Sequence, residues 1–159
     1  MADLKSCFGQ IGLLDVQTYI QSGNVVFRTN ILENSTLVND LSALMLKEFG
    51  LDVAVAVFKN SEWKGIIEAA PEWWGRDITW KHNILIMTKE VDIAHMVAQI
   101  GVLEPHIEAI AAGERVIYQS ISVENFSRAT SGRLASLPIY KSMTVRNYNT
   151  ATKIRGLLT

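Results

Sequence analysis

The sequence has little cysteine and proline and, in its last part, no acidic residue at all. Because Cys7 is its one cysteine, the chain cannot form an intrachain disulfide. A low cysteine content is typical of the reducing cytoplasm, and we expect the protein to be located there. No apolar run approaches the ~18 residues that a membrane-spanning helix needs, so we expect no membrane association. Residues 1–10 lack the basic stretch and apolar core of a signal peptide.

The absence of acids after Glu124 makes the charge distribution uneven. Residues 1–124 hold 9 Lys and Arg and 16 Asp and Glu, a net charge of −7. Residues 125–159 hold 6 Lys and Arg and no acid, and the two parts together give the formal net charge of −1. Charge separation of this kind attracts anions to one part of a molecule, or pairs that part with an acidic surface.

Motifs for metal binding and for common catalytic mechanisms are also absent. The histidines His82, His95 and His106 are spaced too widely for one helical face, and no H-E-x-x-H or C-x-x-C occurs. We expect each of them to be a surface or hydrogen-bonded residue. The chain has no G-x-S-x-G nucleophile elbow and no P-loop. We therefore predict no metal and no cofactor, and it stays open whether the protein is an enzyme.

Apolar periodicity predicts the elements of the first half of the chain. In order, they are a helix, two strands, a helix, a strand and a short helix, over residues 2–11, 15–21, 24–29, 34–49, 53–58 and 61–70. Gly23 can take the positive φ of a tight hairpin, and Gly12 and Gly50 can end helices. Asn34 or Ser35 can cap the second helix, and Ser61 the third; these are further expectations from sequence alone.

The second half repeats this order with one additional strand at its start. The predicted elements are a strand, a helix, two strands, a helix, a strand and a final helix, over residues 82–88, 90–100, 106–112, 115–121, 123–135, 142–146 and 149–158. We expect Gly113 and Glu114 to join the two middle strands. Because Glu104 and Glu108 lie at a turn entering a strand, we do not expect them to act as an acid/base couple.

The repeated order predicts an α+β protein of two tandem ferredoxin-like units, each with an antiparallel sheet built from the split β-α-β motif. We place the first unit at 1–70, a tryptophan-rich connector at 71–81 and the second unit at 82–159. Four tryptophans are expected to pack the joint between the halves: Trp63, Trp73, Trp74 and Trp80.

The first unit lacks the opening strand, which lies in the middle of the sheet in this fold. Without it, two neighbouring strands face a gap with unpaired N–H and C=O groups. A strand from another chain can fill the gap, the sheet can close up, or the chain is a truncated form that folds poorly. We favour self-association or an incompletely assigned start of the chain.

Two stretches resemble a bacterial domain-of-unknown-function family, number sixteen ninety-seven: TYIQSGNVVF (18–27) and TVRNYNTATKI (144–154). The order of the elements between them agrees, so the resemblance covers nearly the whole chain. Members usually begin with a strand and a turn of the form RGINVGG, and this chain starts after that point. They often have Trp where Tyr148 stands here. The resemblance implies a ferredoxin-like fold and no established activity.

The acid-free C-terminal segment holds the first candidate site. We expect Arg146 to end a strand, next to the N-terminus of the last helix, where free N–H groups and a partial positive charge favour phosphate. The residues assigned to this anion site are Arg146, Asn147, Asn149, Thr150, Arg128, Arg133 and Lys141. In the alternative, Asn147 or Asn149 only caps the helix, and the arginines pair with acids or lie on a solvated face.

The first hairpin holds a secondary candidate site. Tyr19 and Gln21 share one face of their strand, and Ser22 and Asn24 lie at the turn. A polar strand face with an aromatic ring can stack a nucleic-acid base, as in ferredoxin-like RNA binders. The alternative is an ordinary solvent-facing strand.

Three functions follow from these patterns. The preferred one is a binding module for a phosphate-bearing ligand, either a nucleotide or RNA. The others are an enzyme that acts on a small phosphorylated substrate, and a self-associating structural or regulatory protein such as a homodimer. The net charge of −1 argues against a dedicated binder of duplex DNA, because such proteins are usually basic.

Overall fold

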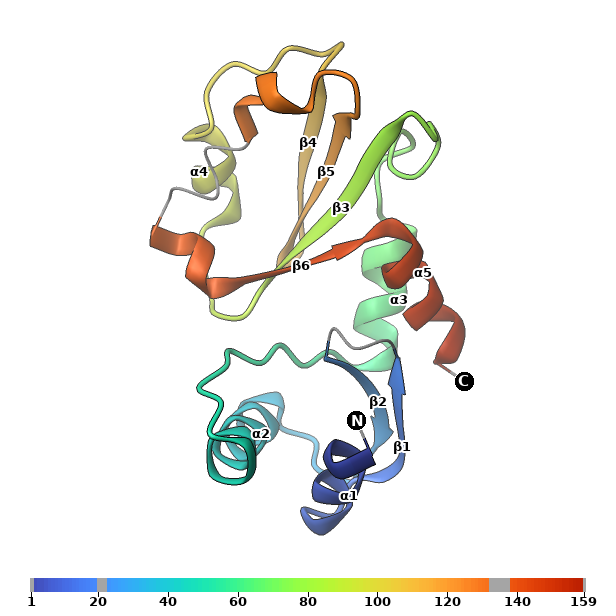
Figure 1. The fold of residues 1–159 in the computed structure, drawn as a ribbon, viewed down its shortest axis with the longest axis vertical. Helices are drawn as coiled ribbons and strands as arrows, with labels where there is room; N and C mark the ends of the chain where they lie inside the picture. Colours follow the sequence, from blue (N-terminus) through green and yellow to red (C-terminus); the bar gives the residue numbers. More distant parts are fainter. Residues whose placement is uncertain (1, 20–22, 132–137, 159) are drawn as a thin grey trace. The chain divides into compact units, whose positions relative to one another are not determined.

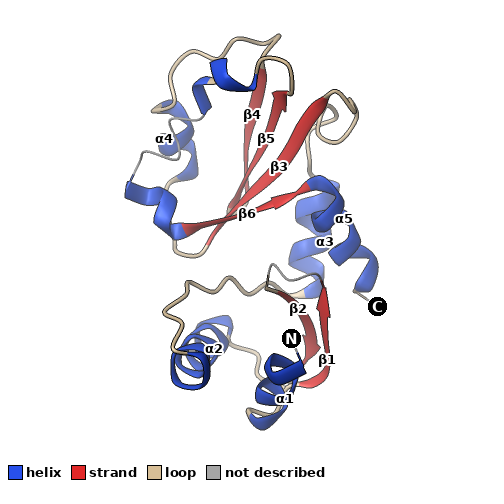
Figure 2. Cartoon of the chain, in the orientation of Figure 1, coloured by secondary structure: helices blue, strands red, loops and turns tan. Residues whose placement is uncertain are grey.

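The computed structural model describes residues 2–19, 23–131 and 138–158 of the chain (Figure 1). Its elements, in chain order, are α1 (Ala2–Gln10), β1 (Leu14–Tyr19), β2 (Asn24–Arg28), α2 (Asn34–Phe49), α3 (Asn60–Glu68), β3 (Trp80–Met87), α4 (Ile93–Ala98), β4 (Glu108–Gly113), β5 (Val116–Ser122), β6 (Met143–Asn147) and α5 (Tyr148–Leu157). The 3₁₀ segments Phe126–Arg128 and Pro138–Ser142 precede β6. Helices accompany two antiparallel sheets, which confirms the α+β class (Figure 2).

The chain divides into two compact units. Unit 1 consists of residues 1–60 and 153–159, and unit 2 of residues 61–152. The predicted connector, 71–81, therefore lies within unit 2, and the predicted domain limits stay a prediction. Among the described residues, no helix has both the length and the apolar character that crossing a membrane requires.

Unit 1 packs two helices against a two-stranded antiparallel sheet of β1 and β2. The core forms where the apolar residues of α1, β1 and α2 meet: Phe8, Leu13, Val16, Leu37, Leu41 and Leu44, together with Val57. Cys7 is half-buried against this core. Gly50 ends α2 at a φ of 65°, where its N–H donates to the carbonyl of Leu46 at 3.0 Å.

Unit 2 is built on a four-stranded antiparallel sheet with the order β4-β5-β3-β6. The strand that opens the unit, β3, lies in the interior of the sheet between β5 and β6. It pairs Ile84 with Tyr118 on one side and with Arg146 on the other. Because β3 is covered on both faces, its sequence ILIM is apolar at four successive positions, all of them buried.

Different helices pack on the two faces of this sheet. Leu85 and Met87 of β3 pack with Met96 of α4 on one face. Tyr118 is adjacent to Ile117 in β5 and therefore faces the other way, where its hydroxyl donates to the carbonyl of Ile66 in α3. On this second face the indole N–H of Trp63 donates to the carbonyl of Ala151 in α5 at 3.2 Å.

Two of the predicted elements are wrong. Residues 51–59 form neither helix nor strand, although the alternation of valine and alanine predicted a strand over 53–58. Alternation favours an extended chain, but a strand also needs a hydrogen-bonded neighbour, and the described sheet of unit 1 contains only β1 and β2. The predicted helix over 123–135 is also absent from the described part of that stretch. There, Glu108 accepts the backbone N–H groups of Thr130 and Ser131 instead.

Two predicted caps differ as well. Glu33, not Asn34 or Ser35, is the N-cap residue of α2, and no side chain caps this helix. The hydroxyl of Ser35 instead donates to the Glu33 carboxylate at 3.1 Å. Helix α3 begins at Asn60, one residue before the predicted cap Ser61. Helix ends depend on such local competition for hydrogen bonds, which periodicity does not report.

Two of the four tryptophans are buried inside unit 2. The indole N–H of Trp74 donates to the carbonyl of Asn83 at 2.8 Å, and its ring packs edge-on against Tyr118 and Tyr148. Trp63 is fixed by its bond to Ala151. Both rings therefore help to pack the second face of the sheet, and a role for tryptophan in the joint between the halves stays a prediction.

The buried hydroxyl of Tyr118 predicts a loss of stability at high pH. Burial raises the pKa of Tyr118 above its ordinary value of 10.0, so the folded state holds this proton more tightly than the unfolded state. The resulting stability is complete below about pH 10 and is lost as pH rises through the folded-state pKa. Urea unfolding between about pH 9 and about pH 11 should show a smaller loss in Tyr118→Phe than in the wild type. Parallel losses in both proteins would contradict this assignment.

Candidate functional site

The guanidinium of Arg146 is held by its own strand. Its Nη1 donates to the hydroxyl of Thr144 at 2.7 Å and to the carbonyl of Val145 at 2.8 Å. The side chain is half-buried, and desolvation lowers the pKa of Arg146 from its usual value without removing the charge. The structure thus places Arg146 at the end of β6 as predicted, in a fixed orientation.

Asn147 is the cap of α5. Its side-chain oxygen accepts the backbone N–H of Thr150 at 2.8 Å, which satisfies one of the free donors of the helix. Thr150 is buried and Asn149 is exposed. The structure therefore brings Arg146, Asn147 and Thr150 together. The geometry at Asn147 is that of a helix cap, which agrees with the alternative that Asn147 caps the last helix instead of binding an anion.

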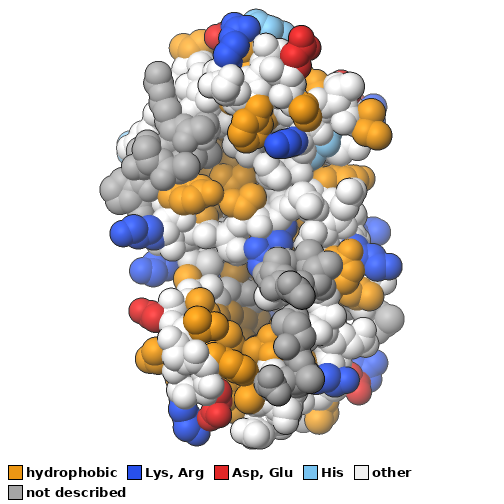
Figure 3. Space-filling view, viewed as in Figure 1, with side chains coloured by type: hydrophobic (Ala, Val, Ile, Leu, Met, Phe, Trp, Pro, Cys, Tyr) orange, Lys and Arg blue, Asp and Glu red, His pale blue; other side chains and the backbone are white. Residues whose placement is uncertain are grey.

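The other predicted cations do not join this group. Arg128 pairs with Glu104 at 3.2 Å, beside the edge strand β4, whereas Arg146 lies on the opposite edge strand β6. Lys141 is exposed and lies in the 3₁₀ segment Pro138–Ser142 before β6, five positions before Arg146 in the chain. Arg133 lies outside the described residues. Lys and Arg side chains are likewise scattered over the face of the described residues in Figure 3.

The structure describes only some of the candidate residues in the β1–β2 hairpin. Gln21 and Ser22 lie outside the described residues. Tyr19 is half-buried and pairs across the sheet with Asn24. The side-chain amide of Asn24, which is 8% exposed, donates to the carbonyl of Tyr19 at 3.2 Å. Asn24 thus has a structural bond that closes the hairpin.

A histidine and a serine form a hydrogen-bonded pair that sequence reasoning missed. His82 Nδ1 and Ser120 Oγ lie 2.6 Å apart on adjacent strands, and His82 Nε2 lies 2.7 Å from the carbonyl oxygen of Asp77. A carbonyl can only accept, so Nε2 carries the proton and Nδ1 accepts from the serine hydroxyl. Ser120 is only 1% exposed, so a substrate cannot reach it. The pair therefore holds β3, β5 and the Asp77 turn together.

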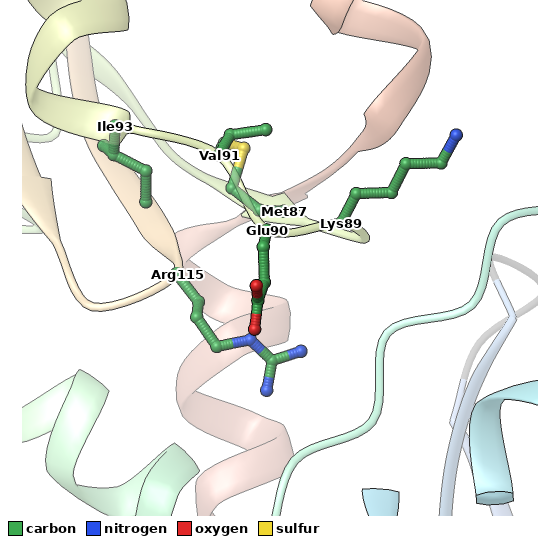
Figure 4. Close-up of a pocket in the computed structure, with 6 residues that line it drawn as sticks. All are labelled: Met87, Lys89, Glu90, Val91, Ile93 and Arg115. Atoms are coloured by element: carbon green, nitrogen blue, oxygen red, sulfur yellow. The ribbon is translucent and has the colours of Figure 1, made fainter. Parts of the chain in front are cut away.

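A pocket opens at the end of β3, where the chain turns towards α4 (Figure 4). Its volume is about 290 Å³, and its lining comes from the β3–α4 connection and from the β4–β5 turn: Met87, Lys89, Glu90, Val91, Ile93 and Arg115. We call it the Lys89–Arg115 pocket. Two backbone bonds at 2.9 Å hold its rim, from Met87 N–H to Arg115 C=O and from Thr88 N–H to Ser142 C=O.

The pocket combines charges with an apolar wall. The Glu90 carboxylate and the Arg115 guanidinium point towards each other, whereas Lys89 extends to one side (Figure 4). Arginine has five N–H donors, so a guanidinium that faces one carboxylate can also donate to a ligand oxygen. Met87, Val91 and Ile93 supply the wall. Such a site can hold a small molecule with an anionic group and an apolar part.

Arg115 has an unusual backbone. Its φ of 59° is in the left-handed region, which costs a non-glycine residue about 1 kcal/mol. Gly113, which we expected in the turn, is instead the last residue of β4, so the turn consists of Glu114 and Arg115. Sequence reasoning missed the pocket because Lys89 and Arg115 are far apart in the chain. They meet only through the β3–β5 register, which pairs Ile86 with Val116.

No group of three or more His, Cys, Asp or Glu side chains in the described part of the chain could hold a metal ion. His95 contacts Gln99 at 2.9 Å, and His106 contacts Glu104 at 3.4 Å. With the His82 pair, these contacts confirm that all three histidines are hydrogen-bonded or surface residues.

Comparison with known proteins supports the fold. Residues 1–118 match the family described as "Protein of unknown function (DUF1697)". The structure is similar to that of a conserved bacterial protein from Streptococcus pneumoniae, with a TM-score of 0.86 and 27% sequence identity. That match covers 100% of this chain and 88% of the streptococcal chain. No curated protein matches the chain.

Proposed function

The chain belongs to the DUF1697 family, whose description assigns no activity, and we propose that it binds a small phosphate-bearing molecule in the Lys89–Arg115 pocket. The observation that supports this most is that a lysine and an arginine, Lys89 and Arg115, both line one cavity. Arginine matches the oxygens of phosphate in a bidentate way, and lysine adds a point charge.

Charges of both signs lie around the pocket. Lys141, a residue of the predicted anion site, adjoins Ser142, whose carbonyl accepts from Thr88 at the rim. Glu90, Asp92 and Glu114 lie at the same end of the sheet and balance the charges of Lys89, Arg115 and Lys141. We therefore propose a ligand with one phosphate group rather than a polyphosphate.

The size of the pocket favours a small ligand over RNA. A volume of about 290 Å³ is at the lower end of the range for small-molecule sites. RNA binders of ferredoxin-like fold stack bases on an open sheet face, but both faces of the unit 2 sheet are covered. The aromatic rings of Trp74, Tyr118 and Tyr148 pack against one another there.

The tandem arrangement also belongs to the proposal. We propose that each unit is ferredoxin-like. The sheet order β4-β5-β3-β6 supports this for unit 2, and the sequence of elements from α1 to α2 supports it for unit 1.

The test of the binding proposal is a thermal-shift panel of phosphate, sugar phosphates, nucleoside monophosphates and short RNA. A ligand at 100 times its dissociation constant should stabilise the wild type by ~2.7 kcal/mol. Lys89→Ala should weaken that ligand roughly tenfold or more, because a charge-assisted hydrogen bond is lost. Lys5→Ala, which removes an exposed lysine from α1 in unit 1, is the matched control and should bind like the wild type.

The variant Arg146→Ala distinguishes binding in the Lys89–Arg115 pocket from binding at the end of β6. Under the proposal this variant keeps its affinity once its own stability is taken into account. Loss of binding in Arg146→Ala alone would move the site to the β6–α5 junction. The absence of any shift across the panel, or equal binding by Lys89→Ala and the wild type, would overturn the proposal.

A further inference from the structure

Three of the six residues that line the Lys89–Arg115 pocket carry a charge, and their charges differ in sign. Lys89 and Arg115 are positive and Glu90 is negative, so the lining has a formal charge of +1. A carboxylate beside a bound phosphate repels it, because both groups are negative. Phosphate binding alone therefore leaves Glu90 without a role.

The three charged groups come from two places in the fold and point in different directions. Lys89 and Glu90 belong to the connection between β3 and α4, and Arg115 belongs to the β4–β5 turn. The Glu90 carboxylate points towards the Arg115 guanidinium, whereas the neighbouring Lys89 side chain extends to another side (Figure 4). All three residues are exposed, so a ligand can reach their charged groups. The pocket thus offers a bound molecule two groups that only donate and one that only accepts.

The charge of the lining also limits the charge of the ligand. A phosphate monoester without another charged group carries about −1.5 to −2 at neutral pH, which exceeds the +1 of the lining. The balanced charges around the pocket supply no further attraction for an anion. A phosphate monoester that also bears an ammonium group has a net charge of about −1 and matches the lining.

We infer that Glu90 makes the pocket specific for a zwitterionic phosphate monoester, an ester whose carbon chain also bears a primary ammonium group. This inference rests on the phosphate binding proposed above. Lys89 and Arg115 donate to the phosphate oxygens, and Glu90 accepts from the ammonium group. The apolar wall of the pocket contacts the carbon chain between the two groups. Phosphates of amino alcohols and of amino sugars belong to this class, and they are small enough for a volume of about 290 Å³.

The alternative role of Glu90 is to orient the Arg115 guanidinium without contact to the ligand. In that role Glu90 strengthens the binding of every phosphate ester to the same degree. As an acceptor for the ligand, it strengthens the binding of esters with an ammonium group and weakens that of esters without one. The two roles therefore differ in the preference between two matched esters.

The test compares ethanolamine phosphate with ethyl phosphate, two esters of similar size that differ in the ammonium group. Isothermal titration calorimetry of the full chain gives both dissociation constants. The wild type should bind ethanolamine phosphate roughly tenfold more tightly, because it gains a charge-assisted hydrogen bond to Glu90. In Glu90→Gln this preference should fall to about twofold or less, because the amide carries no charge.

Glu114→Gln is the matched control. It removes the same charge from an exposed residue of the β4–β5 turn that does not line the pocket. Its effect on the two esters should be equal, so the preference for ethanolamine phosphate should stay at roughly tenfold. Loss of the preference in Glu114→Gln as well as in Glu90→Gln would show that the general charge of this end of the sheet selects the ligand, which would overturn the inference.

The remaining outcomes separate this inference from the phosphate proposal. Equal affinity of the wild type for the two esters would overturn the inference and leave phosphate binding in place. Equal weakening of both esters in Glu90→Gln would also overturn it and assign Glu90 to the positioning of Arg115. Ethanolamine without phosphate should bind far more weakly than its phosphate ester, and equal binding would overturn the phosphate proposal. If the wild type bound neither ester, both proposals would be overturned.

Discussion

Gly75→Ala should lower the free energy of unfolding by about 3 kcal/mol. This is the largest effect that we expect from a substitution that removes no interaction of the wild type. Gly75 has a φ of 88°, which strains any residue with a Cβ atom. A Cβ atom there would lie 2.1 Å from Cε2 of Tyr148, far inside van der Waals contact. The ring cannot move away freely, because it packs edge-on against Trp74 at a centroid distance of 4.9 Å.

Two further variants separate strain from collision. Gly65→Ala is the matched control: Gly65 lies in α3, a new Cβ would meet nothing within 4 Å, and helix propensity should stabilise by about 1 kcal/mol. Adding Tyr148→Ala to Gly75→Ala should cost less than the sum of the two single changes, because the collision disappears with the ring. Strict additivity in urea unfolding would show that backbone strain alone accounts for the loss.

Glu108→Ala should destabilise the protein by about 3 kcal/mol, through the opposite mechanism of removing an acceptor. Glu108 is 1% exposed, and its two carboxylate oxygens accept the N–H groups of Thr130 at 2.7 Å and Ser131 at 2.9 Å. Alanine would leave two donors without acceptors in a buried place and open a cavity beside β4.

The amide and an exposed acid provide the comparisons. Glu108→Gln keeps one acceptor oxygen and the shape of the side chain, so about half of the loss should return. Glu104→Ala removes an exposed acid that pairs with Arg128, and it should change stability by less than about 1 kcal/mol. Chemical denaturation would measure the free energy of unfolding of all three variants. A Glu108→Ala protein as stable as Glu104→Ala would show that the Thr130–Ser131 turn finds other acceptors.

Local patterns were enough for most of the fold. Gly12 and Gly50 end the first two helices at positive φ, as their positions in the sequence predicted. The valine-rich stretch 53–58 failed because strand formation depends on a neighbour that lies elsewhere in the chain. The helix expected over 123–135 failed for a related reason: Glu108, from β4, takes the N–H groups that a helix would have used inside itself.

The candidate site was harder to predict than the fold. The strand-to-helix position of Arg146 and the capping role of Asn147 follow from adjacent residues, and the structure shows both. Lys89 and Arg115 carry no local signal, because their proximity results from the β3–β5 register. The His82–Ser120 pair has the same origin. A site assembled across strands becomes visible only when the register of those strands is known.

The central place of β3 also has a consequence for how the protein is made. β3 is the first strand of unit 2 to be synthesised. β6, which pairs with the second edge of β3, is among the last elements to be synthesised. Until then the apolar run Ile84–Met87 has one open edge, and such runs are prone to intermolecular pairing. Closure of this sheet is a long-range event and therefore slow. The rate of synthesis and the supply of chaperones should thus affect the yield of native chains.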